Sequence, residues 1–175
     1  MPQNHTNQIR VAGKPLITYF RKGIILDTGP LLFFLAGNYD FDSIGRMPLT
    51  KEYKQEDFLL LQNFIKKFRK IIITPHILAE VSDIAENELD AHFLDFVNRI
   101  KKILLDSEEA RIKKNEILEN EQIGKFGVTD VSIILSSKTN NQFILTKDLP
   151  FALLCQSKNL PVFHFDWLRE LSWSS

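Results

Sequence analysis

The chain has 175 residues, enough for one domain with a substantial core. Lys and Arg together number 22, as do Asp and Glu, which argues against bulk attraction to nucleic acid but leaves a local basic rim open. A single cysteine, Cys155, excludes an intrachain disulfide framework and favours a reducing, cytoplasmic location. No apolar run approaches the roughly 20 residues that cross a bilayer, and no signal-peptide core is present, so we expect no membrane partner.

The clearest local pattern is an apolar run that ends in an aspartate. Residues 23–26 are Gly-Ile-Ile-Leu, and Asp27 follows directly. Such a run, without polar alternation, predicts a strand buried on both faces of a parallel sheet. Pro30, after Thr-Gly, predicts the start of a helix. Asp27 should therefore lie at the carboxyl end of a central strand, where open α/β sheets bind their ligands.

The segments on either side of this run are less regular. Residues 1–22 are predicted to form a polar tail or arm, in which residues 16–20 add either a short strand or a packed arm. Residues 37–57 contain Gly45 and Pro48 and are long for a loop in a small domain. We interpret them as a functional or partly helical lid.

A basic cluster ends the next predicted element, an amphipathic helix over residues 58–68. Its members are Lys66, Lys67, Arg69 and Lys70. The cluster suits the negative end of a helix dipole, and contact with RNA is the alternative interpretation.

A second acid follows the second predicted strand, residues 71–74, which leads into a helix. At about 100° per residue, Glu80 falls at the border of the apolar stripe of this helix, where a carboxylate can point into a cleft. His76 lies one turn earlier and is interpreted as a surface or capping residue.

Two more acids occupy comparable positions. Asp130 lies at the border of the apolar stripe of a helix predicted over residues 124–135. Asp148 follows a third buried strand, residues 142–146. Taken singly, Asp27 and Asp148 could be helix caps, and the other two acids ordinary surface residues.

The remaining segments complete the predicted fold. The charge-rich residues 106–121 are expected to form a solvated helical hairpin. Residues 160–165 resemble a fourth strand, and residues 166–171 a closing helix capped by Asp166. The alternation of buried strands and helices predicts an α/β protein of three α/β/α layers, with a central, mainly parallel sheet of four to five strands.

This topology brings Asp27 and Asp148 to one sheet edge, with Glu80 and Asp130 projecting from nearby helices. Four carboxylates that converge repel one another, and a hard divalent cation such as Mg²⁺ removes that repulsion with oxygen ligands. His and Cys residues with the spacing of a zinc site are absent from the sequence.

Four short motifs in this chain together resemble those of the PIN-domain (PilT N-terminus) ribonucleases, which include the VapC-type toxins. The motifs are Leu26-Asp27-Thr28, Thr74 to Glu80, Gly127-Val128-Thr129-Asp130, and Thr146-Lys147-Asp148 with Phe151. The resemblance covers about residues 23–165 and implies a PIN-like nuclease domain over residues 23–175.

The resemblance further implies that the four acids are the catalytic and metal-binding residues, holding Mg²⁺ or Mn²⁺ for hydrolysis of phosphodiester bonds in single-stranded or structured RNA. Thr28 and Thr146 match hydroxyl positions that support such a site. Three lysines near the acids in sequence could contact the RNA backbone, although each could equally be a plain surface residue; they are Lys125, Lys138 and Lys147. An antitoxin protein and a homodimer are further partners that the resemblance implies.

Two other functions remain open at this point. One is a catalytically inactive PIN-like module that binds RNA or protein. The other is a phosphotransfer enzyme or receiver with Asp27 as the phosphoacceptor, although haloacid-dehalogenase-like phosphatases place a second Asp where this chain has Gly29.

Overall fold

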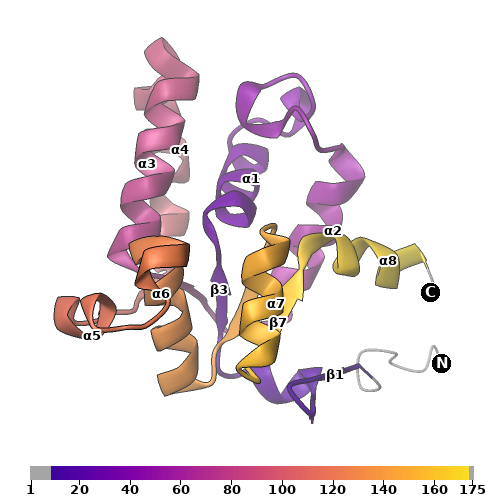
Figure 1. Cartoon of the computed structure of the whole chain (residues 1–175). Helices are drawn as coiled ribbons and strands as arrows, with labels where there is room; N and C mark the ends of the chain where they lie inside the picture. Colours follow the sequence, from indigo (N-terminus) through magenta and orange to yellow (C-terminus); the bar gives the residue numbers. More distant parts are fainter. Residues whose placement is uncertain (1–8, 174–175) are drawn as a thin grey trace.

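The computed structural model describes residues 9–173, with side chains described as far as residue 170. The first eight residues of the predicted tail therefore lie outside the described residues. A five-stranded sheet, parallel throughout, forms the centre in the order β5-β4-β3-β6-β7 (Figure 1). Its strands are β3 (Ile24–Leu26), β4 (Ile71–Ile73), β5 (Glu108–Glu109), β6 (Phe143–Thr146) and β7 (Val162–His164). The predicted α/β class and parallel sheet are confirmed.

The two central strands, β3 and β6, are buried on both faces along their whole length. They pair in register, with Leu26 opposite Leu145. The backbone amide of Asp27 extends the ladder by one hydrogen bond to the Leu145 carbonyl, at 3.0 Å. Because both strands consist almost entirely of large apolar residues, they are stable only when helices cover both faces.

Helices cover the sheet in two layers, as the contacts between them show. One layer contains α1 (Thr28–Tyr39), α2 (Gln55–Ile65), α3 (Pro75–Leu89), α4 (Phe93–Asp106) and α8 (Phe165–Trp173). The other contains α5 (Lys114–Leu118), α6 (Ile123–Asn140) and α7 (Leu149–Ser157). Figure 1 shows α7 in front of the sheet and α3 beside α4 at its left. The molecule is therefore the three-layer α/β/α arrangement that the alternation of elements predicted.

The strand order reverses between β3 and β6. From β3 the chain moves outward through β4 to β5, then crosses back to β6 and continues to β7. At such a reversal the two connections leave on opposite faces, which opens a crevice at the carboxyl ends of the strands. Asp27 follows β3 and Asp148 follows β6, so both acids lie at this crevice.

The irregular segments pack differently from one another. Residues 16–20 belong to a packed arm rather than a strand, because the 3₁₀ helix η2 (Leu16–Tyr19) buries Leu16 and Tyr19, after a short hairpin of β1 (Arg10–Val11) and β2 (Lys14–Pro15). The long 37–57 segment is partly helical, since α1 continues into it and the 3₁₀ helices η3 (Phe41–Ser43) and η4 (Pro48–Thr50) follow.

Two predictions are wrong. Residues 106–121 do not form a helical hairpin: β5 pairs with β4, the Ala110 amide donates to the Ile73 carbonyl at 3.0 Å, and only α5 is helical. The backbone groups along the outer edge of β4 need hydrogen-bond partners, which residues 108–110 supply as a strand and a solvated helix would not. Asp166 is not the cap of the last helix, because α8 begins one residue earlier, at Phe165.

Two further features follow from the burial pattern. The Cys155 thiol is buried among apolar side chains, which raises its pKa to about 12 and makes it a poor nucleophile. Among residues 9–173, no helix combines the length and apolar character that a bilayer crossing requires.

Candidate active site

A cavity of about 350 Å³ lies at the carboxyl edge of the sheet. Its walls come from the start of α1, the middle of α3, the kinked part of α6 and the turn after β6. All four predicted acids line it, namely Asp27, Glu80, Asp130 and Asp148. The structure thus brings together four carboxylates, of which the first and the last, Asp27 and Asp148, lie more than 100 residues apart in the sequence.

Asp27 is the most constrained of the four, with 9% of its surface exposed. It is the N-cap residue of α1, and its Oδ1 accepts a hydrogen bond from the Thr28 amide at 2.7 Å. Its Oδ2 accepts a second from the Thr146 hydroxyl at 2.6 Å. Burial is the largest influence on this carboxyl and raises its pKa, and the charges of Glu80 and Asp148 act in the same direction.

Thr146 joins the ends of the two central strands. Besides donating to Asp27, its hydroxyl oxygen accepts a hydrogen bond from the backbone amide of Asp148 at 3.0 Å. Asp148 in turn caps α7, since its Oδ1 accepts from the Phe151 amide at 2.9 Å. A continuous chain of hydrogen bonds therefore fixes the spacing between Asp27 and the exposed Asp148.

Glu80 is exposed on α3, and one hydrogen bond orients it. The Thr28 hydroxyl donates to its Oε2 at 2.5 Å, linking α1 to α3 across 52 residues of sequence. A flexible exposed glutamate is thereby held against the cavity wall. Both threonines that the sequence marked as supporting residues, Thr28 and Thr146, thus contact a candidate acid directly.

Asp130 stands next to a break in α6. Gly127 has φ 81° and ψ −178°, a conformation that only glycine adopts readily, so the helix changes direction immediately before this acid. Burial, the largest influence, and the charges of Asp27, Asp148 and Glu80 together raise the Asp130 pKa to about 7. In the described part of the chain, no hydrogen bond or positive charge lowers it. The four carboxylates therefore share one electrostatic environment.

Carboxylate oxygens are the type of ligand that a hard divalent cation prefers, but the four acids do not form a closed set of ligands. Among residues 9–173, no three His, Cys, Asp or Glu side chains are arranged so that they could hold a metal ion. Mg²⁺ keeps several of its waters and needs only one or two direct carboxylates, so it requires a closed set of protein ligands less than Zn²⁺ does. The carboxylates would hold such an ion partly through water.

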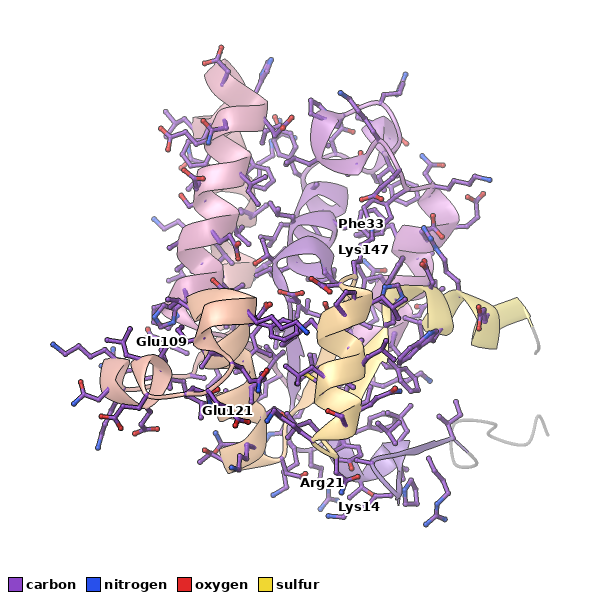
Figure 2. All side chains as sticks on the ribbon, viewed as in Figure 1. Lys14, Arg21, Phe33, Glu109, Glu121 and Lys147 are labelled. Atoms are coloured by element: carbon purple, nitrogen blue, oxygen red, sulfur yellow. The ribbon has the colours of Figure 1, made fainter. Side chains whose placement is uncertain are left out.

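The three predicted substrate-binding lysines lie in different places. Lys147 is nearest to the acids in the chain, but its Nζ pairs with Glu52 at 2.5 Å and lies 4.4 Å from the centre of the Tyr53 ring. Figure 2 shows Lys147 beside Phe33, whose ring stacks on Tyr53. Lys125 is exposed next to the cavity wall. Lys138 lies in the last turn of α6, away from the cavity.

Several residues of the site were not predicted from the sequence. Phe126 lines the cavity beside Val128 and Thr129, which the sequence marked only as part of the Asp130 motif, and Glu52 forms an ion pair with Lys147. The glycine inside a predicted helix was a signal of the break at residue 127. His76 does not line the cavity, and Thr74 rather than His76 caps α3.

A scan against protein-family models finds no match for this chain, and a search of curated proteins returns no significantly similar sequence. The functional interpretation therefore rests on the residues and their geometry.

Proposed function

We propose that this protein is a metal-dependent phosphodiester hydrolase, and more specifically a PIN-like endoribonuclease that uses Mg²⁺ or Mn²⁺. One observation carries the proposal: four carboxylates line one cavity, and the charges of three of them add to burial in raising the pKa of the fourth, Asp130, to about 7. The cavity lies at the reversal of strand order, where open parallel sheets bind ligands.

Charge repulsion among these acids is hard to explain as a structural device. An acid that served only as a helix cap would gain nothing from three acidic neighbours, and at neutral pH each added charge destabilises the fold. A cation that binds to the site reverses this cost. The hydrogen bonds from Thr28 and Thr146 are already in place, so the acids they orient need little rearrangement.

The chain's own residues have distinct roles in this mechanism. Asp27, hydrogen-bonded through both oxygens, and Glu80, hydrogen-bonded through one, line the cavity and would act as ligands of the cation. Asp130 carries a proton for part of the time at pH 7, so loading of the site releases that proton. A bound divalent cation supplies an activated water and stabilises charge on the phosphate.

RNA is the substrate class that the proposal names, in single-stranded or looped regions where the backbone can enter a cavity. If the protein is the toxin of a toxin–antitoxin pair, its antitoxin should place an Arg or Lys among the four acids. Dimerisation belongs to the same proposal, as an expectation from the resemblance to PIN-domain ribonucleases.

Asp27→Asn and Asp130→Asn should each abolish Mn²⁺-dependent cleavage of a labelled RNA while the protein stays folded. Asp83→Asn is a matched control, because Asp83 is exposed on α3 and does not line the cavity. Wild-type protein with EDTA should be as inactive as the variants. Equal cleavage by wild type and an Asp27→Asn/Asp130→Asn double variant would reject the proposal.

A catalytically inactive binding module is the second candidate, favoured by the lack of a closed ligand set among residues 9–173. Calorimetric titration with Mn²⁺ separates the two: saturable binding that Asp27→Asn removes supports the hydrolase, and no binding supports the module. A phosphoacceptor role for Asp27 fits less well, because both of its oxygens already accept hydrogen bonds.

A further inference from the structure

The opposite edge of the sheet carries a concentration of positive charge. The turn before β3 holds Arg21 and Lys22, and the segment between α2 and β4 holds four more basic residues. We call these six the amino-edge patch: Arg21, Lys22, Lys66, Lys67, Arg69 and Lys70. Five of them are exposed and Lys70 is half-buried.

The fold joins two distant segments to make this patch. The Arg69 amide donates to the Phe20 carbonyl at 2.8 Å, and the Ile24 amide donates to the Lys70 carbonyl at 3.0 Å. Phe20 and Phe68 pack edge to face beneath them, with ring centres 5.1 Å apart. The basic residues are therefore presented from a rigid base, on segments nearly fifty residues apart in sequence.

Most of these charges have no acidic partner. Within residues 9–173, Lys70 is the one member that forms an ion pair, with Glu108, while Lys66 bonds the neutral Gln62. A helix dipole accounts for cations only within the last turn of α2, and Arg21 and Lys22 belong to a different segment. Five uncompensated cations on a chain of zero net charge are a strongly asymmetric distribution.

Resting on the proposed function, we propose that the amino-edge patch is a second RNA-binding surface. It binds the phosphate backbone of the substrate at a site remote from the acidic cavity. Four carboxylates repel RNA, so affinity must come from elsewhere on the molecule. Lys147, the nearest lysine to the cavity in sequence, is committed to Glu52. Lys22 precedes Asp27 by five residues along β3, or about 16 Å at about 3.3 Å per residue. Figure 2 shows Arg21 at the lower end of the molecule, well below Lys147.

The test is RNA binding by the full-length protein in EDTA, where cleavage cannot occur. The probe is a fluorescein-labelled polyuridine strand of about 20 nucleotides, followed by anisotropy between about 50 and 300 mM NaCl. The variant is Lys66→Gln/Lys67→Gln/Arg69→Gln. Its matched control, Lys101→Gln/Lys102→Gln/Lys114→Gln, removes the same charge from exposed positions on α4 and α5.

The patch variant should bind the strand about 10- to 100-fold more weakly at 0.1 M salt, and the slope of log K against log salt should fall by about 2, since each phosphate contact contributes about 0.7 for single strands. The control should bind like wild type, and the circular dichroism of both should be unchanged. Equal RNA affinity of the patch variant and the control would overturn the inference.

Two other outcomes separate the hypotheses. Loss of binding to phosphatidylserine vesicles in the patch variant, with RNA affinity unchanged, would assign the patch to an anionic membrane surface and overturn the RNA assignment. Because the assay needs no catalysis, normal RNA binding through the patch together with absent Mn²⁺-dependent cleavage would reject the proposed function and leave the patch as an RNA site.

Discussion

Replacement of Asp130 by Asn should stabilise the metal-free protein at pH 8. Burial and three neighbouring carboxylates raise the Asp130 pKa from its ordinary 3.8 to about 7. Between pH 3.8 and about 7, Asp130 is therefore protonated in the folded state but ionised in the unfolded state. The stability associated with that proton is fully present below about pH 4 and is lost as the pH rises through 7.

The size of the effect follows from the same values. Raising a pKa from 3.8 to about 7 corresponds to about 4 kcal/mol at high pH, at about 1.4 kcal/mol for each tenfold change. Because the Asp130 side chain is only partly buried, screening by solvent reduces the figure to about 2 kcal/mol. Asn carries no charge, so the variant should gain about this much at pH 8 and less than half as much at pH 5, where the pH is only about one unit above the unfolded pKa.

Urea unfolding in EDTA at the two pH values measures this difference directly, with Asp83→Asn as the control for loss of an exposed charge. Added Mn²⁺ should stabilise the wild type at pH 8 and leave Asp130→Asn less affected. A variant that is no more stable than wild type at pH 8, or equally stabilised at pH 5, would refute the claim that the four acids repel one another.

Three further changes have defined outcomes. Thr146→Val removes the hydrogen bond to the buried Asp27 and should lower the free energy of unfolding by about 2 kcal/mol at pH 7, measured in urea, with weaker Mn²⁺ binding by calorimetry. Glu52→Gln should free Lys147 and tighten RNA binding about two- to fivefold at low salt; an unchanged anisotropy titration would count against Lys147 as an RNA contact. Gly127→Ala should cost about 1–3 kcal/mol because of its φ of 81°, with a fall in cleavage rate because Asp130 shifts; a fully active, equally stable variant would show that the break in α6 is dispensable.

The positions of the acids could be predicted because each depends on a local pattern. Asp27 and Asp148 follow buried apolar runs, and parallel strands bring their carboxyl ends to one edge. Glu80 and Asp130 were found from helical periodicity, which places a residue on a face without saying what it meets. That all four line one cavity needed the strand order, which no local pattern supplies.

The errors also have physical causes. The two residues of β5, Glu108 and Glu109, have neither alternation nor β-branched side chains, so only the open edge of β4 makes them a strand. The sequence marked Thr146 as a supporting residue, but it could not give the partner of its hydroxyl, a carboxylate 119 residues away. The Asp130 pKa depends on distances among four side chains, which composition and spacing do not contain.

The pairing of β3 with β6 also determines when the central sheet and the acidic cavity can form during synthesis of the chain. A nascent chain released before residue 143 has β3, with its buried isoleucines, facing solvent along one open edge. Such a fragment also lacks Thr146, which holds Asp27, and Asp148 itself. Prematurely terminated products should therefore lack a complete acidic cavity, aggregate readily and be targets for proteolysis. The cavity forms only once the last third of the polypeptide has left the ribosome.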